Sequence, residues 1–277
     1  AFQAPLPILI VLVTSILVAA IGFFDDRKPI AARRRLGAQI VLFGIAVLGV
    51  IPLSPLAADL GLPVVLLFGL LVLAGVYWIN LFNFMDGIDG LAASEAMFMA
   101  LAAALLALLD IPELTGHPGL WWLVALAAAS FGFLCLNWPP ARIFMGDAGS
   151  TYLGFIIAIL ALLTINWGWL TPWQWGILAA PFITDATVTL VRRLLQGESL
   201  IEAHRRHAYQ ALARRWRSHR KVTLMLLALN LVWVLPLTYA AGWQESFGMQ
   251  LALIAYVPLV FFAIVAGAGA PEDEVDL

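Results

Sequence analysis

Long apolar runs recur along this chain of 277 residues, and each is close to the roughly 20 residues that an α-helix needs to cross a bilayer. Hydrophobic residues make up 63% of the sequence and charged residues 12%, which is far more apolar than a soluble domain. The short alternating segments of an outer-membrane barrel do not occur. The runs therefore predict an all-α, polytopic integral membrane bundle with about nine transmembrane helices. We expect these at Pro5–Gly22, Leu36–Pro52, Leu62–Ile79, Leu91–Leu109, Leu120–Asn137, Thr151–Asn166, Gln174–Val191, Val222–Ala241 and Met249–Gly267.

The basic residues predict how these helices are oriented. Nine spans leave two alternating sets of loops, and all 15 Lys and Arg residues fall in one set. The positive-inside rule places that set in the cytoplasm. Its members are 23–35, 80–90, 138–150 and 192–221.

We expect a single membrane domain over residues 1–277, ending in a solvated acidic tail at 271–277. The basic cytoplasmic ends suit membrane lipids and phosphate-bearing substrates, and we expect no nucleic-acid partner. Small residues at Ala100–Ala107 favour close helix packing and thus a homodimer.

The segment Asn83-Phe84-Met85-Asp86-Gly87-Ile88-Asp89-Gly90 places two carboxylates and an amide between two apolar runs. Ionisable residues at the edge of a span are candidates for function. A glycine turn in which Asn83 and Asp86 cap the next helix is the alternative. That alternative accounts for one acid but not for Asp86 and Asp89 together with Asn80 and Asn83.

Two further acid motifs lie in cytoplasmic loops. Asp25 and Asp26 directly follow the first predicted span, and adjacent carboxylates repel one another unless a cation is near. A magnesium ion or a phosphate-facing role would suit them, whereas local pairing with neighbouring basic residues is the alternative. Asp147 lies in a Gly-x-x-Gly turn, and its alternative role is to cap the helix that starts near Ser150.

The longest loop, 192–221, is basic and carries histidines. Its Ser199-Leu200-Ile201-Glu202 has the pattern of a capping box, which predicts a short cytoplasmic helix. His204 and His207 would then share one helix face. We expect these residues to bind a diphosphate, and the alternative is an interfacial helix that lies on anionic lipid. A zinc site is disfavoured because no Cys accompanies the histidines.

Asp185 lies inside the seventh predicted span, about 10 Å from its cytoplasmic end. It could reach a polar chamber formed by the cytoplasmic motifs, or pair locally with a Thr or Arg. The other acid motifs all lie on the cytoplasmic side. This arrangement favours a function in which a soluble phosphorylated donor reacts with a lipid phosphate at the membrane surface. A transporter would place its key polar groups near mid-membrane.

Three motifs, in this order, resemble those of the polyprenyl-phosphate N-acetylhexosamine-1-phosphate transferases, a family related to phospho-N-acetylmuramoyl-pentapeptide transferase. They are Asp25-Asp26-Arg27, Asn83-x-x-Asp86-Gly-Ile-Asp89-Gly and Phe144-Met-Gly-Asp147-x-Gly-Ser150. The resemblance implies transfer of a sugar 1-phosphate from a UDP-N-acetylhexosamine to undecaprenyl phosphate, with release of UMP. It also implies Mg²⁺, with Mn²⁺ as an alternative, and a bacterial inner-membrane enzyme whose active site faces the cytoplasm.

The resemblance carries roles onto individual residues. Asp25 and Asp26 match the acidic pair near the metal and the lipid phosphate, and Asp25 is the candidate base or phosphate-orienting group. Asp147 matches a magnesium ligand, so the expected catalytic set is Asp25, Asp26 and Asp147, with the metal on Asp147 and Asp26. The expected substrate-binding residues are Asn83, Asp86, Asp89, Asn137, His204, Arg205 and His207.

The chain departs from the family pattern in two ways. Tyr209 and Gln210 stand where related enzymes carry further histidines, which resembles the branch that initiates O-antigen or similar glycans. Two N-terminal spans that are usual in the family are absent, so we expect a fragment or a mature form that lacks some substrate contacts.

Other functions fit less well. A CDP-alcohol phosphotransferase would need Ala-Arg after its Asp-Gly motif, whereas Leu91-Ala92-Ala93 follows Gly90. An aromatic prenyltransferase would need two Asp-rich motifs, but Asp147 stands alone. A transporter is disfavoured by the position of the acids.

Overall fold

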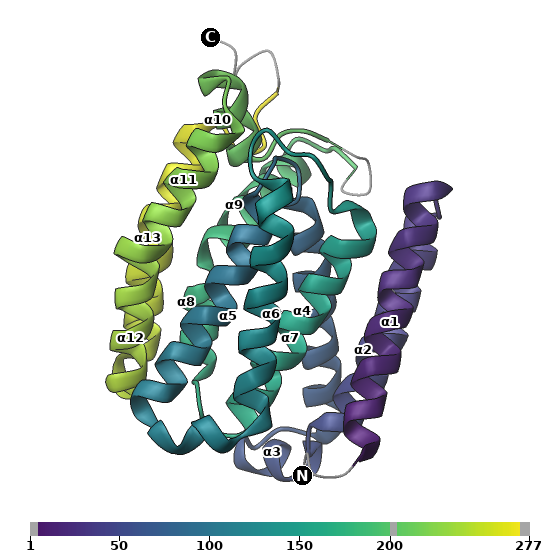
Figure 1. Cartoon of the computed structure of the whole chain (residues 1–277), viewed down its shortest axis with the longest axis vertical. Coiled ribbons are helices and arrows are strands. Elements are labelled where there is room, and N and C mark those ends of the chain that lie inside the picture. The colour runs from purple at the N-terminus through teal and green to yellow at the C-terminus, as the bar shows by residue number, and fades with distance from the viewer. Residues whose placement is uncertain (1–4, 200–203, 272–277) are drawn as a thin grey trace. The chain divides into compact units, whose positions relative to one another are not determined.

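The computed structural model describes residues 5–199 and 204–271. All regular secondary structure in these two ranges is helical, as predicted (Figure 1). In hydrocarbon a backbone must satisfy its own hydrogen bonds, and a helix does so within one segment. The polytopic helical membrane fold is therefore confirmed.

Contacts between residues divide the chain into two compact units. Unit 1 comprises Ala1–Asn83 and Met145–Trp167, and unit 2 comprises Phe84–Phe144 and Gly168–Leu277. The single membrane domain expected from the sequence stays a prediction.

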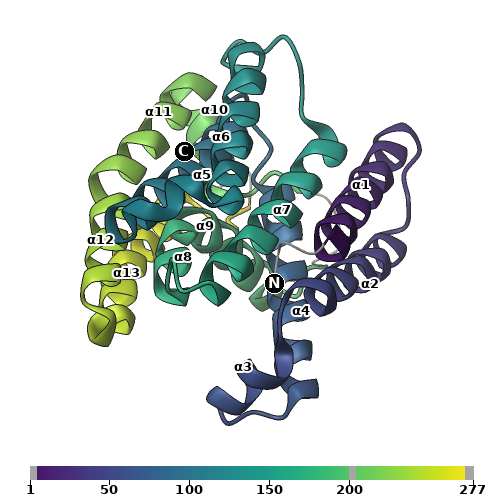
Figure 2. The same cartoon turned by 60° about the horizontal axis from the view of Figure 1, so that its bottom comes forward.

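Unit 1 is built around α1, which packs against both α2 and α7. The rings of Phe43 in α2 and Phe155 in α7 meet edge to face, with centroids 5.6 Å apart. Figure 2 shows α3 turned away from α2, and the bend between these two helices is 83°. The helices are α1 Pro5–Arg27, α2 Ala32–Val50, α3 Leu53–Asp59, α4 Val64–Phe84 and α7 Gly146–Asn166.

In unit 2, α5 packs on α6, and α13 packs on α8, α9 and α12 (Figure 1). Glu95 in α5 is fully buried, and the side-chain amide of Asn230 donates a hydrogen bond of 2.6 Å to its carboxyl group. The α-helices are α5 Leu91–Asp110, α6 Pro118–Asn137, α8 Pro172–Leu178, α9 Ala180–Leu195, α10 Ala208–Trp216, α11 His219–Leu229, α12 Leu235–Trp243 and α13 Gly248–Ala266. Shorter turns are η1 Pro112–Gly116, η2 Asn230–Val234 and η3 Glu245–Phe247.

Within the described residues, seven helices are long and apolar enough to cross a membrane, or eight if α2 and α3 form one broken span. The predicted span Gln174–Val191 is instead two helices, α8 and α9, which meet at Ala179. Pro181 explains the break, because proline lacks an N–H and its ring crowds the carbonyl one turn earlier. The predicted count of nine is therefore approximate.

Several helix ends differ from the hydropathy-based bounds, and the difference matters for the acids. α1 continues to Arg27, so Asp25 and Asp26 lie in its last turn and not in a loop. α7 begins at Gly146, so Asp147 lies in its first turn. Hydropathy marks where a segment leaves hydrocarbon, whereas helical hydrogen bonding continues into polar residues.

The short helix predicted to start at Ser199 cannot be followed, because Leu200–Ala203 lie outside the described residues. His204 is not helical, and α10 begins at Ala208 with His207 as its N-cap. The interpretation that His204 and His207 share a helix face is therefore wrong. Their rings nevertheless lie close, with centroids 4.9 Å apart. Most of the predicted acidic tail, 272–277, is also outside the described residues.

Candidate active site

In unit 1, four helix ends contribute polar side chains to one cluster. Asp25 and Asp26 come from the end of α1, and Arg35 comes from the first turn of α2. Asn83 lies near the end of α4, and Asp147 lies at the start of α7. The cluster contains the three residues expected to be catalytic and one expected to bind substrate.

Arg35 joins the acids of this cluster. Its Nη1 donates to Asp147 Oδ2 at 2.6 Å and also to Asp25 Oδ2. The amide nitrogen of Asn83 donates to the other oxygen of Asp147 at 2.9 Å and to Ser150 Oγ at 2.8 Å. The side chain of Asp25 is 9% exposed and that of Asp147 is 29% exposed, so a single cation holds two partly desolvated carboxylates together.

Sequence reasoning missed Arg35. It is the third of three consecutive arginines at the start of α2, and nothing in the sequence distinguishes it from Arg33 and Arg34. The structure does distinguish it, because Arg33 and Arg34 are exposed while Arg35 is half-buried against the acids.

Asp26 has a different role from Asp25. Its two carboxylate oxygens accept the backbone N–H groups of Asp147 at 2.8 Å and of Ala148 at 3.2 Å. These N–H groups lack partners within α7, so Asp26 caps that helix from another part of the chain. Its expected role as a metal ligand stays a prediction.

Close contact between α1 and α7 depends on Gly22. A Cβ at this position would lie 2.4 Å from the carbonyl oxygen of Asp147. Only a glycine lets the two helix backbones approach closely enough for Asp26 to reach the start of α7.

The donor atoms of unit 1 fit a hard cation. A cavity of about 20 Å³ lies beside Arg35, Asn83 and Asp147, and its size matches roughly one water-sized occupant. Mg²⁺ prefers oxygen ligands and is commonly held by one or two carboxylates together with substrate phosphates. Among the described residues no group of three or more His, Cys, Asp or Glu side chains could hold a metal alone. A Mg²⁺ ion at Asp147 would therefore need further oxygen ligands from a substrate, and its presence stays a prediction.

In unit 2, the loop that follows α4 is held by internal hydrogen bonds. Asp89 Oδ2 accepts the N–H of Ala141 at 3.1 Å and lies 3.3 Å from Nδ1 of His219. The buried amide of Asn137 accepts the N–H of Gly90 at 2.9 Å and donates to the carbonyl of Ile143 at 2.8 Å. Two residues expected to bind substrate thus make structural hydrogen bonds, and sequence alone did not indicate these partners.

Asp86 lies half-buried in the same loop. The alternative in which Asn83 and Asp86 cap the next helix is not what the structure shows. The N-cap of α5 is Gly90, with a φ of 79° and no side-chain cap. Contact between Asp86 and a nucleotide stays a prediction.

Asp185 projects from α9 to the start of α10. Its carboxylate accepts the N–H groups of Ala208 at 2.8 Å and Tyr209 at 2.9 Å. It also accepts the hydroxyl of Thr189 at 3.2 Å and lies 3.3 Å from Nδ1 of His207. The local pairing considered from the sequence is present, but its main partner is the helix N-terminus.

His207 is almost fully buried, with 2% of its surface exposed. Its ring stacks on Phe84 and on Tyr209, with centroid distances of 6.2 and 5.7 Å. The Tyr209 hydroxyl donates to the carbonyl of Phe84 at 2.9 Å. Burial, reinforced by the negative charges of Asp185 and Asp86, raises the pKa of Tyr209 well above its usual value, so the hydroxyl remains a donor.

His204 and Glu198 lie beside the same segment. Burial, followed by the positive charges of His207, Arg193 and Arg206, lowers the pKa of His204 to about 4. The pKa of Glu198 is lowered by hydrogen bonds from Arg193 and Arg206. His204 is therefore neutral at pH 7 and offers hydrogen bonding but no charge.

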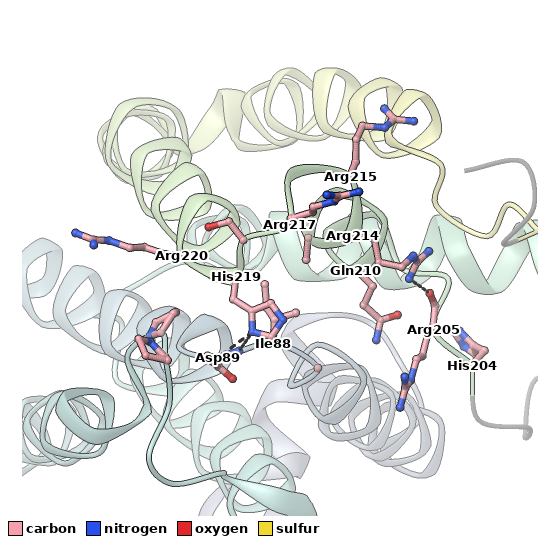
Figure 3. A pocket seen from close by; sticks show the side chains of 15 residues that line it. Ile88, Asp89, His204, Arg205, Gln210, Arg214, Arg215, Arg217, His219 and Arg220 are labelled. Atoms are coloured by element: carbon pink, nitrogen blue, oxygen red, sulfur yellow. Dashed lines mark hydrogen bonds and ion pairs between the residues drawn. The ribbon is translucent and has the colours of Figure 1, made fainter. Parts of the chain in front are cut away.

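A large basic pocket of about 1550 Å³ opens in unit 2 (Figure 3). Asp89 is the acid on its wall, and Figure 3 shows His219 turned towards it and Arg214 turned to the backbone of Arg205. His204 and Arg205 line the pocket and the buried His207 does not, and substrate binding by these residues stays a prediction. The basic and histidine residues on the wall are His204, Arg205, Arg214, Arg215, Arg217, His219 and Arg220.

Comparison with known proteins identifies the family to which this chain belongs. The model of glycosyl transferase family 4 matches residues 8–165. A decaprenyl-phosphate N-acetylglucosaminephosphotransferase of Mycobacterium leprae is 30% identical over 78% of this chain and 60% of its own length. A probable undecaprenyl-phosphate N-acetylglucosaminyl 1-phosphate transferase of Bacillus subtilis is 27% identical, over 92% of this chain and 71% of its own.

A phospho-N-acetylmuramoyl-pentapeptide-transferase of Heliobacterium modesticaldum is 37% identical over 52% of this chain and 49% of its own length. The chain thus spans only about half to seven tenths of these relatives. The family model nevertheless covers more than half of the chain, and it includes the acids of unit 1. The chain belongs to glycosyl transferase family 4.

Proposed function

We propose that this protein transfers an N-acetylhexosamine 1-phosphate from a UDP-sugar to undecaprenyl phosphate and thereby initiates a lipid-linked glycan. In this reaction the sugar-bearing phosphorus becomes bonded to an oxygen of the lipid phosphate. The bond from that phosphorus to the bridging oxygen breaks, and UMP leaves with the bridging oxygen. The relatives from Mycobacterium leprae and Bacillus subtilis, whose names describe polyprenyl-phosphate substrates, support this class of reaction.

The observation that carries the proposal is the convergence of Asp25 and Asp147 on Arg35. Phosphoryl transfer needs charge neutralisation and alignment more than covalent help from the protein. Arg35 supplies a fixed positive charge, and Asp25 and Asp147 supply oxygen ligands. When bound, Mg²⁺ would neutralise charge on the donor diphosphate and help to align it.

The basic pocket of unit 2 supports a donor with several negative charges. Five arginines on its wall match a nucleoside diphosphate, because guanidinium groups recognise phosphate oxygens in pairs. Arg205 and the neutral His204 are the wall residues that we assign to the donor.

We further propose an inner-membrane location with the site on the cytoplasmic side. The segregation of all 15 Lys and Arg residues into one set of loops supports this orientation. The proposed product is the first lipid-linked intermediate of an O-antigen or a similar polysaccharide, since Tyr209 and Gln210 replace histidines of related enzymes.

UMP release from the purified full chain tests the proposal. The assay supplies undecaprenyl phosphate, Mg²⁺ and, separately, UDP-GlcNAc, UDP-FucNAc or UDP-QuiNAc. We expect turnover with at least one donor and its loss in Asp147→Asn and in Asp26→Asn. Asp110→Asn, at an exposed acid at the other end of α5, is the matched control and should retain activity. Absence of turnover with every donor, or full activity in Asp147→Asn, would contradict the proposal.

A further inference from the structure

α10 supplies much of the wall of the basic pocket. Gln210 and Arg214 lie on this helix, and Arg205 precedes it by three residues. The guanidinium of Arg214 donates to the carbonyl of Arg205 at 2.8 Å, so the two pocket arginines are tied to each other. Any group that fixes the start of α10 therefore also fixes these side chains.

Asp185 is the side chain from another helix that grips the start of α10. One carboxylate oxygen accepts the N–H of Ala208 and the other accepts the N–H of Tyr209, so the carboxylate is bidentate at the first turn of α10. These N–H groups have no partner inside the helix, and the positive end of the helix dipole favours a carboxylate there. Asp185 therefore stabilises the start of α10 both by hydrogen bonds and by its charge.

The contact is buried on all sides. Asp185 is 7% exposed, while Ala208 and Tyr209 are each 4% exposed. A buried carboxylate is tolerated only where donors replace its lost water. Removing one oxygen acceptor would leave an N–H of α10 unpaired, and that cost is large enough to move the helix start.

Asp185 also sets the orientation of the His207 ring. Nδ1 lies 3.3 Å from the carboxylate, which favours a proton on Nδ1 and so orients the ring. Stacking on Phe84 and Tyr209 then fixes the plane of the ring. One carboxylate therefore controls both the helix start and the residue directly before it.

We propose that Asp185 is a positioning residue, which acts through α10 and His207 to place Arg205 and Gln210 on the wall of the donor pocket. This inference rests on the proposed function, because it identifies the pocket with the donor. Asp185 does not itself line that pocket.

The test is Asp185→Asn, which keeps the size of the side chain but replaces one acceptor oxygen by a donor. Thr184→Val is the matched control, because the buried hydroxyl of Thr184 lies on the same helix and has no hydrogen-bond partner among the described residues. UMP release is measured with donor and lipid acceptor varied separately, and hydrogen–deuterium exchange is followed in peptides covering 205–216.

We expect Asp185→Asn to raise the donor KM by about 10-fold, since small misplacements of binding groups have effects of this order. The KM of the lipid acceptor should stay within about 2-fold of the wild-type value. Exchange should become faster in α10 but not in α7. Thr184→Val should resemble the wild type in all three measurements. Asp185→Glu, which keeps the charge, should recover part of the donor affinity.

An unchanged donor KM, an equal rise in both KM values or unchanged exchange in α10 would each overturn the inference. If Asp185→Asn does not fold, Asp185→Glu decides, and a raised donor KM with unchanged exchange in α10 in that variant overturns the inference. If the wild-type protein turns over no donor, the proposed function fails. The exchange measurement then still decides whether Asp185 holds α10.

Discussion

In unit 1 the carboxylate of Asp26 accepts the first N–H groups of α7, and in unit 2 the carboxylate of Asp185 accepts those of α10. In each case the two carboxylate oxygens accept two consecutive N–H groups, one each. The capped helix begins beside a residue of the candidate site, Asp147 in one unit and His207 in the other. A carboxylate from elsewhere in the chain can hold a helix start more rigidly than a local cap, because it also fixes the helix against a second element.

The two caps lie beside sites of opposite charge: the site in unit 1 is mainly acidic and the pocket in unit 2 is basic. In unit 1, Asp25 and Asp147 gather around Arg35, which suits a metal ion and a phosphate. In unit 2 arginines line a pocket, while Asp185 is turned into the fold, which suits a polyanion. The proposed reaction requires both kinds of surface.

The largest expected effect is that of Arg35→Ala. Two carboxylates of unit 1 would lose their common cation, and we expect UMP release to fall by about 10³-fold, as when an arginine that neutralises transferred phosphate is removed. Arg34→Ala is the matched control, since Arg34 is a neighbouring arginine but is exposed. Equal effects of the two substitutions would show that general basicity, and not the bridge to Asp25 and Asp147, is what matters.

Gly22→Ala should come next, with an effect on stability. The new Cβ would meet backbone atoms of Asp147, which cannot rotate away, so we expect a loss of about 1–3 kcal/mol of unfolding free energy and weaker activity. Gly37→Ala is the control, because a Cβ at Gly37 has nothing within 4 Å. Thermal unfolding in detergent measures both. A stable, active Gly22→Ala variant would contradict the close approach of α1 and α7.

Gly87→Ala is the counterpart in unit 2 and should cost less. Its Cβ would lie 2.1 Å from the hydroxyl oxygen of Tyr209, which is a side-chain atom, whereas a Cβ at Gly22 would meet backbone atoms. We expect a lower melting temperature and a donor KM raised by roughly 2- to 5-fold. Adding Tyr209→Phe removes the clashing oxygen, so the double variant should recover part of the loss. If the double variant shows no recovery, the contact with the Tyr209 hydroxyl is not the reason that Gly87→Ala is unfavourable.

The smallest expected effect concerns His204 and pH. Its pKa is about 4 in the folded protein and 6.5 in the unfolded chain, so the unfolded chain takes up a proton first as the pH falls. Stability should therefore decline from about pH 6.5 towards pH 4, and His204→Gln should reduce that decline. The pKa of Glu198 is lowered from 4.5, so its contribution is lost only as the pH falls below about 4.5, outside the interval between pH 7 and pH 5. Melting temperatures at pH 7 and pH 5 measure the difference, and identical slopes in the two proteins would count against the buried, neutral His204.

Part of the candidate site could be predicted from the sequence. The acids at the ends of apolar runs stood out because charge is costly there, and Asp25, Asp26, Asn83 and Asp147 do converge in unit 1. The partners of these side chains could not be predicted, because they depend on which helix ends pack together. The sequence does not distinguish Arg35 from its neighbours, and it does not indicate the backbone partners of Asp89 and Asn137.

Hydropathy and charge patterning are enough to predict a bundle of membrane helices with acidic and basic motifs at the helix ends, because both are properties of single residues and their spacing. Which carboxylate pairs with an arginine, which caps a helix and which holds a loop follows from how the helix ends pack in three dimensions. The reason is physical: a buried carboxylate takes its role from the donors around it, and those donors come from segments far apart in the chain.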